Sequence, residues 1–323
     1  NGLNQVIQGN NIALNWETTL LEQEKSGKKE QEHSAPYYKY VDKNPDHLDV
    51  MKDEEEELKE GKIEWFSFKQ HFFSAVMIPA VPFEKGSLAV KVSIEPGKIK
   101  WYGATMQMPF NQLAAQSYAM NIYFGTNKFS TLKAQGHEIE KQVDMGYWPL
   151  KYINRFIVLP VFNFLEGFGW NYGLIILILT ILLKVAMSPL TYKSYISMAK
   201  MRILKPEMDE VKAKVGEDNP TLLQQEYLKL YKQVGVNPLG GCLPMLLQLP
   251  FVMAFFFFFP NLFELRGESF LWMKDLSTYD DFIKFGFNIP FIGDHLSLMC
   301  VLMTISTLIY TYFNNQISGA TGQ

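Results

Sequence analysis

The longest apolar stretch of the chain runs from residue 172 to 190, YGLIILILTILLKVAMSPL, and Lys184 is its one charged side chain. A helix of roughly 20 such residues matches the hydrocarbon thickness of a bilayer. Two more apolar stretches follow, at 239–263 and 296–313. The pattern therefore predicts a membrane core over 169–323, with spans at about 172–191, 239–263 and 296–313.

The first part of the chain has a different pattern. Apolar and polar residues alternate at 12–16 and again at 88–94, where a Pro-Gly turn follows before the alternation resumes. Period-two alternation is typical of half-buried strands, and the turn predicts a hairpin. The aromatic segment 65–73 supplies bulk for a core. We therefore predict an all-β sandwich over residues 1–145.

A strongly acidic stretch interrupts these strands. Five consecutive acids run from Asp53 to Glu57. Such a run is usually a solvated loop or a frayed helix. A metal site built from these carboxylates is the less favoured alternative.

Residues 146–168 show helical periodicity. Apolar residues recur at spacings of three and four, whereas Lys151, Arg155 and Glu166 fall elsewhere. This pattern predicts an amphipathic helix in the membrane interface, with Phe156 and Ile157 on its apolar face. A packing helix of the β domain is the alternative. The segment is the only connection expected between the β domain and the spans.

The segment 192–236 predicts two helices joined by a Gly/Pro turn, which form an antiparallel hairpin. Eight basic residues lie between 192 and 238, whereas the loop 264–295 has three basic residues against six acids. Positive loops stay in the cytoplasm. The hairpin is therefore predicted to be cytoplasmic, and the 264–295 loop and the β domain to be periplasmic.

Composition excludes several functions. The net charge is −3, so the chain as a whole has no positive electrostatic potential that would attract nucleic acid. The five histidines show no metal-ligand spacing, and no nucleophile or phosphate-binding motif occurs. An enzyme is therefore disfavoured, and no cofactor is expected.

Lys184 has two interpretations. A charge inside a span costs a few kcal/mol, so it usually faces protein or water and serves a function. A lysine near the end of a span can instead extend its ammonium to the headgroups without any function. The apolar stretch alone does not decide between them.

Three motifs carry a resemblance: MSPLTYKSYISMAKMRILKPEM, VNPLGGCLPMLLQLP and FELRGESFLWMKDLS. With them the chain resembles the YidC/Oxa/Alb family of membrane protein insertases, of the Gram-negative type with a large periplasmic domain. The resemblance extends from about Trp65 to Phe313 and includes FSAVMIP and VDMGYW. It implies a β-supersandwich periplasmic domain, a helical membrane core with a cytoplasmic hairpin, and an N-terminal anchor and two more core helices outside these residues.

The resemblance also implies a function. The family inserts and folds inner-membrane proteins, alone or with the Sec translocon (SecYEG and SecDF), and the hairpin lies near the ribosome. Its other partners are nascent membrane proteins and the lipid bilayer. A solute or ion transporter that uses Lys184 as an ion-site charge, or a membrane-anchored periplasmic binding protein, are the alternatives.

Individual residues carry over by position. Lys184 occupies the place of a groove cation that is usually Arg; Lys keeps the charge but loses the bidentate fork. Thr180 and Gln248 match other groove positions. In the hairpin we assign the receiving role to Lys200, Arg202 and Lys205.

Overall fold

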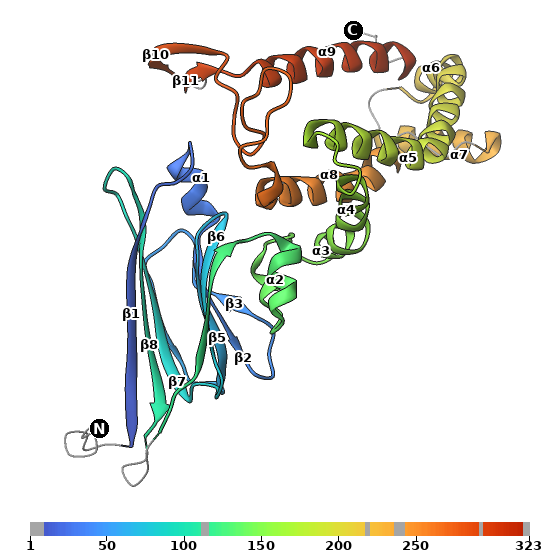
Figure 1. Cartoon of the computed structure of the whole chain (residues 1–323). Coiled ribbons are helices and arrows are strands. Elements are labelled where there is room, and N and C mark those ends of the chain that lie inside the picture. Colours follow the sequence, from blue (N-terminus) through green and yellow to red (C-terminus); the bar gives the residue numbers. More distant parts are fainter. Residues whose placement is uncertain (1–9, 111–115, 217–219, 236–242, 291–292, 319–323) are drawn as a thin grey trace. The chain divides into compact units, whose positions relative to one another are not determined.

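The computed structural model describes residues 10–110, 116–216, 220–235, 243–290 and 293–318. The chain divides into two compact units (Figure 1). The sheet unit comprises Asn1–Met145 and Phe257–Arg266, and the helical unit comprises Gly146–Phe256 and Gly267–Gln323.

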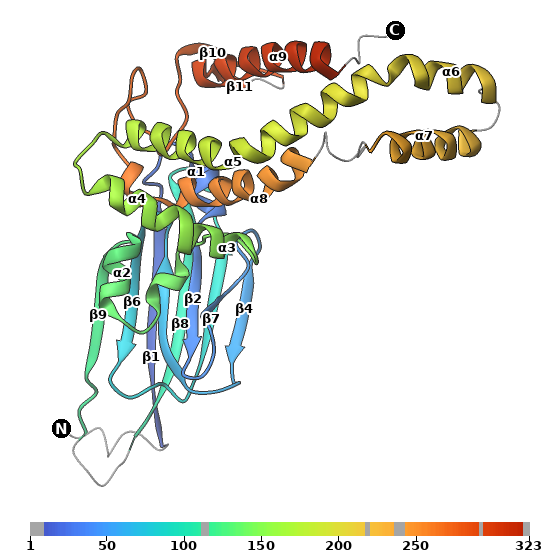
Figure 2. The same ribbon diagram turned by 90° about the vertical axis from the view of Figure 1, so that its right-hand side faces the viewer.

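The sheet unit contains two antiparallel sheets, visible in Figures 1 and 2. One has the order β1-β8-β7-β4 and the other the order β3-β2-β5-β6-β9. The strands are β1 (Asn11–Leu21), β2 (Ala35–Tyr40), β3 (Asp46–His47), β4 (Glu54–Leu58), β5 (Ile63–Lys69), β6 (Phe73–Pro79), β7 (Lys85–Val92), β8 (Lys98–Pro109) and β9 (Met120–Thr126). The predicted hairpin is confirmed, because β7 pairs with β8 across the Pro-Gly turn.

The core lies between the two sheets. Phe66 and Phe68 of β5 are buried against Tyr102 and Met106 of β8. The rings of Phe68 and Tyr102 lie 5.5 Å apart. Burying each such side chain stabilises the fold by roughly 1.5–3 kcal/mol. The aromatic segment 65–73 therefore forms the core as the sequence predicts.

The unit is mostly β-sheet, as the sequence predicts. It also contains α1 (Gly27–Glu32), α2 (Phe129–Gln135) and the 3₁₀ helix η2 (Ile139–Gln142). Local hydrogen bonds explain the first helix. Ser26 caps its N-terminus by accepting from the Lys29 amide. Such capping residues favour a helix even in a short polar segment.

The acidic run was predicted to be a solvated loop or a frayed helix, and this prediction was wrong. Glu54–Leu58 is the edge strand β4 and pairs with β7. Leu58 is fully buried and anchors the strand. The Tyr38 hydroxyl donates to Glu56 at 2.9 Å, whereas most of the other acids face solvent. Charged residues are tolerated on an edge strand because only one side of it is paired.

The helical unit begins with α3 (Leu150–Ile153), the π-helix η3 (Asn154–Val158) and α4 (Leu159–Glu166). The remaining elements are α5 (Tyr172–Ile203), α6 (Lys205–Val215), α7 (Pro220–Val234), α8 (Leu243–Phe258, whose last two residues belong to the sheet unit), β10 (Ile283–Ile289), β11 (Gly293–Leu296) and α9 (Leu298–Ser318). α6 and α7 lie side by side (Figure 2), and the Tyr231 hydroxyl contacts Met208 Sδ at 3.3 Å.

The helix boundaries differ from the predicted ones in two places. α5 continues through Pro189 to Ile203, so the predicted hairpin 192–236 begins inside α5. α8 ends at Phe258 and not at 263, because Pro260 lacks an amide proton to continue the helix. The residues after α8 form the 3₁₀ turns η5 (Phe259–Asn261) and η6 (Phe263–Leu265).

Among the described residues, one helix is long and apolar enough to cross a bilayer, at Tyr172–Met201. Shorter apolar helices occur at Leu246–Asn261 and Leu298–Phe313. The first predicted span is therefore matched by a helix of sufficient length. The other two spans stay predictions.

Candidate functional site

The predicted groove residues of α5 lie on one exposed side of this helix. Lys184 and Thr180 are four residues apart, about one helical turn, and both are exposed. The Thr180 hydroxyl donates to the Ile176 carbonyl at 2.8 Å. Within the described part of the chain, the Lys184 ammonium makes no hydrogen bond or ion pair. Its neighbours on the surface, Ile181 and Val185, are exposed and apolar.

This arrangement constrains where Lys184 can lie in a bilayer. The buried hydrophobic residues of α5 are Ile175, Leu179 and Met187. Lys184 itself is exposed and is not packed inside its own unit. In hydrocarbon it needs water or a polar partner, because an isolated charge there costs a few kcal/mol.

Gln248 lies on α8 and is partly buried, between the exposed Leu247 and Leu249. No hydrogen bond among the described residues joins it to Thr180 or Lys184. The structure thus brings two of the three predicted groove residues to one surface. Gln248 is not joined to them.

The basic residues of the predicted hairpin lie near the junction of α5 and α6. Lys200 is exposed on the last turns of α5. Arg202 also belongs to α5 and Lys205 opens α6. The side chains of Arg202 and Lys205 lie outside the described residues.

Phe156 and Ile157 lie in η3 and are 66% and 50% exposed. On the opposite side of this helical segment, Leu150, Val158 and Phe162 are buried. The segment therefore packs on the helical unit with one apolar side and exposes a second. A helix that presents large apolar side chains to the outside suits a membrane surface.

Sequence reasoning missed Asn154. It is fully buried in η3, and its amide donates to the Ala254 carbonyl of α8 at 2.6 Å. A buried amide requires such a partner. The signal was available, because Asn154 interrupts the apolar series formed by Leu150, Val158 and Phe162 at spacings of four residues.

Residues of the segment 269–280, which follows α8, contact the N-terminal ends of two apolar helices, α5 and α9. Asn171 caps α5 by accepting from the Gly173 amide at 2.9 Å, and it donates to the Ser269 carbonyl at 2.8 Å. A Cβ atom at Gly173 would lie 2.1 Å from the Phe270 ring. Only glycine therefore allows this close packing.

Asp280 caps the other helix, α9. Its carboxylate accepts from the amides of Leu298 at 2.7 Å and Met299 at 3.3 Å, and from the Trp272 indole at 3.2 Å. Burial raises the pKa of this carboxyl, but hydrogen bonds from Ser297, the two amides and Trp272 outweigh it and hold the pKa below its usual value. Asp280 therefore stays ionised as a helix cap.

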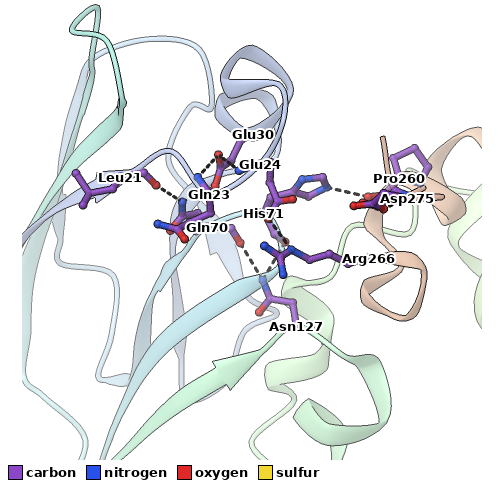
Figure 3. Close-up of polar contacts among 11 residues, drawn as sticks. Leu21, Gln23, Glu24, Glu30, Gln70, His71, Asn127, Pro260, Arg266 and Asp275 are labelled. Atoms are coloured by element: carbon purple, nitrogen blue, oxygen red, sulfur yellow. Dashed lines mark hydrogen bonds and ion pairs between the residues drawn. The ribbon is translucent and has the colours of Figure 1, made fainter. Parts of the chain in front are cut away.

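In the sheet unit, the segment Phe257–Arg266 packs on one end of the sandwich (Figure 3). Figure 3 shows the His71 ring directed at Pro260, with Nε2 2.8 Å from the Pro260 carbonyl oxygen. Arg266 donates to Glu24 at 2.8 Å and its guanidinium lies 5.2 Å from the centre of the Phe73 ring. Lys128 pairs with Glu264 at 3.5 Å.

These contacts correct the expectation that residues 146–168 alone connect the β domain to the apolar helices. The residues directly after α8 are themselves part of the sheet unit. The contacting residues are about 140 to 240 positions apart in sequence. Local patterns could not have revealed such a connection.

Both histidines at this end of the sandwich are neutral near pH 7. Burial, followed by the charges on His33 and Lys69, lowers the pKa of His71 to about 3. Burial, followed by the charge on Lys69, lowers the pKa of His33 to about 4. The two rings are stacked 4.6 Å apart. Since His71 Nε2 faces a carbonyl oxygen, it must carry the proton of the neutral ring.

We expect the stability of the sheet unit to decrease below pH 6.5. In the unfolded chain a histidine takes up a proton near pH 6.5, whereas folded His71 does so only near pH 3. Each histidine therefore makes its full contribution to the free energy of unfolding above pH 6.5. Below that pH, the contribution falls by about 1.4 kcal/mol for each unit that the pH decreases. Urea unfolding of the protein between pH 4.5 and 7 measures it.

The matched variants are His71→Gln and His47→Gln, since His47 is exposed. His71→Gln should remove more of the pH dependence than His47→Gln does. An unaltered pH dependence of the unfolding free energy in His71→Gln would contradict the burial of a neutral His71 against Pro260.

Comparisons with known proteins cover both units. The family model described as YidC periplasmic domain matches residues 10–163, and the model described as 60Kd inner membrane protein matches residues 163–322. The chain belongs to the YidC family. It is thus an inner-membrane protein with a periplasmic domain, and the resemblance inferred from the motifs is confirmed.

Several curated relatives are similar along nearly the whole chain. The protein of Phocaeicola vulgatus is 41% identical over 94% of this chain and 50% of its own length, and that of Bacteroides fragilis is 42% identical over 95% and 51%. The protein of Parabacteroides distasonis is 39% identical over 100% and 53%. Each is named membrane protein insertase YidC. The chain spans about half the length of these relatives.

In the part of the chain that the structure describes, no group of three or more histidine, cysteine or acidic side chains could hold a metal ion.

Proposed function

We propose that this chain belongs to a membrane protein insertase and chaperone that assists the insertion and folding of inner-membrane proteins. The observation that carries the proposal is the identity of about 40% to YidC insertases across both the periplasmic and the helical part. The exposed cation on α5 supports it, because such a charge needs a hydrated surface inside the bilayer.

In this proposal α5 is the first core span, and 239–263 and 296–313 contribute the next two. The hairpin 192–236, with its basic residues, lies in the cytoplasm, and residues 1–145 and 264–295 lie in the periplasm. The charge distribution of the loops supports this orientation. Residues 146–168 lie along the periplasmic membrane surface.

Lys184 and Thr180 form the polar wall of a groove to which Gln248 contributes from the next span. The hydrophilic tail of a nascent chain enters this groove part-way, while its apolar helix leaves along the exposed apolar flank of α5. An unsatisfied polar group in hydrocarbon costs several kcal/mol. The groove lowers that cost by offering an ammonium, a hydroxyl and an amide, and no covalent chemistry or cofactor is needed.

The hairpin receives incoming chains near the ribosome. Lys200, Arg202 and Lys205 lie near the α5–α6 junction and would attract acidic groups of a nascent chain or of ribosomal RNA without sequence specificity. The Sec translocon is proposed as a second partner on the grounds of family membership.

The surface helix gives a testable prediction. Replacing both Phe156 and Ile157 by Asp should release residues 150–166 from the membrane, because each side chain loses roughly 1.5–3 kcal/mol of apolar burial. An environment-sensitive fluorophore on Tyr152→Cys, with Cys242 and Cys300 replaced by Ser, reports the depth. The control variant replaces Phe156 and Ile157 by Leu, and its fluorophore should keep the original depth in the membrane. An unchanged depth in the double Asp variant would argue against the interfacial position.

Reconstitution separates the candidate functions. The full-length protein in vesicles without a translocon should insert a short single-span protein, measured by protection of its translocated end from protease. Solute or ion flux without insertion would favour a transporter. Neither activity would favour a periplasmic binding protein.

A further inference from the structure

The edge strands on the two sides of the β sandwich differ in length and charge. On one side lie β3 and β4, and on the other β1 and β9, since these four strands end the two sheets. An edge strand presents unpaired backbone amides and carbonyls, so proteins normally protect it with charges, short length or cover.

The β3–β4 side has these protections. β3 is two residues long, and β4 carries four consecutive glutamates. The hydrogen bond from Tyr38 to Glu56 also joins β2 to β4 across this side. Another strand is therefore discouraged from pairing here.

The β1–β9 side lacks them. β1 is 11 residues long with Glu17 as its one charged residue, and β9 has seven residues without charge. Trp16 lies only 6.1 Å from Phe124 of β9, ring centre to ring centre. Among the described residues, no strand pairs with the outer edge of either.

Apolar side chains line this edge. Ile12, Leu14 and Trp16 point inward at alternate positions of β1 but are only partly buried. On β9, Ile122 is 48% and Phe124 69% exposed. The apolar side chains of the sandwich are therefore incompletely covered along β1 and β9.

We propose that the outer edge of β9, on the β1–β9 side, binds an extended, uncharged apolar segment of another polypeptide as an additional strand. A polypeptide fits because its backbone matches the free amides and carbonyls of an edge strand, and alternate apolar side chains fit the two-residue period. The absence of charges other than Glu17 favours an uncharged segment. This role of the periplasmic domain does not depend on the proposed groove at Lys184.

The test uses the full-length protein in nanodiscs, with a photo-reactive phenylalanine at position 124. The probe is a synthetic peptide of alternating Val and Thr with lysines at both ends, and the matched probe has Pro at two central positions. The first peptide should cross-link saturably and the second should not, since Pro removes backbone donors. The photo-reactive residue at Glu55 of β4 should capture neither.

Exposed side chains allow variants that leave the core intact. Ile122→Lys should abolish binding of the alternating peptide, whereas Val81→Lys, at an exposed position of a loop, should not. Equal capture of both peptides, or no capture at all, would overturn the proposal. Capture of a second copy of the chain in place of the peptide would also overturn it, since the edge would then be a dimer interface.

Discussion

Lys184→Ala is expected to remove most insertion activity from the full-length protein, while Lys184→Arg keeps it. In the proposed groove the ammonium stabilises polar groups of the entering tail inside the bilayer. Loss of such an interaction costs about 1–3 kcal/mol, which corresponds to a roughly five- to 150-fold slower insertion. Lys184→Glu should be more severe for acidic tails. The rate of protease protection of a single-span substrate in vesicles measures the effect.

The control lies on the other side of α5. Leu182 is exposed, and two residues along a helix turn it away from the side of Lys184. Leu182→Ala should therefore insert substrate at the normal rate. If Lys184 merely reaches the headgroups, Lys184→Ala removes a cost from the span and is harmless. Full activity of Lys184→Ala with acidic and neutral tails would exclude the groove charge.

Lys100→Ala is expected to destabilise the sheet unit by about 3–5 kcal/mol. Lys100 is completely buried, and its ammonium donates to the carbonyls of Gln31 at 2.9 Å, Ser34 at 2.6 Å and Val50 at 2.5 Å. Alanine leaves both a cavity and carbonyl oxygens without this donor, and both effects are costly. The free energy of urea unfolding of the sheet unit measures the loss.

Lys98 provides the comparison on the same strand. It is partly exposed and pairs with Glu95 at 2.6 Å. An exposed ion pair is worth at most about 1 kcal/mol, so Lys98→Ala should change stability little. Similar losses in the two variants would show that Lys100 does not link β8 to the segments around α1.

The elements that sequence predicted well are those set by local pattern. The turn after β7 and the aromatic residues of β5 follow from residues next to one another, and so does the apolar length of α5. The side shared by Thr180 and Lys184 follows from helical spacing. Their role came from the resemblance and is a proposal here.

The elements that sequence missed depend on contacts between distant residues. The acidic strand β4 forms because Leu58 is buried and β7 offers a pairing edge, which the acidic composition conceals. Likewise, Asn154 and His71 each face a carbonyl 100 or more positions away. Helical or strand periodicity contains no information on such partners.

Site-specific photo-cross-linking during insertion tests the central claim most directly. A photo-reactive residue is placed at Thr180 or at Leu182 of the full-length protein, and a ribosome-bound single-span chain is offered to it in vesicles. We predict that Thr180 captures the hydrophilic tail while it is part-way across, and that Leu182, on the opposite side of α5, does not. Equal capture at both positions, or capture at Leu182 alone, would contradict a polar groove on the Thr180–Lys184 side.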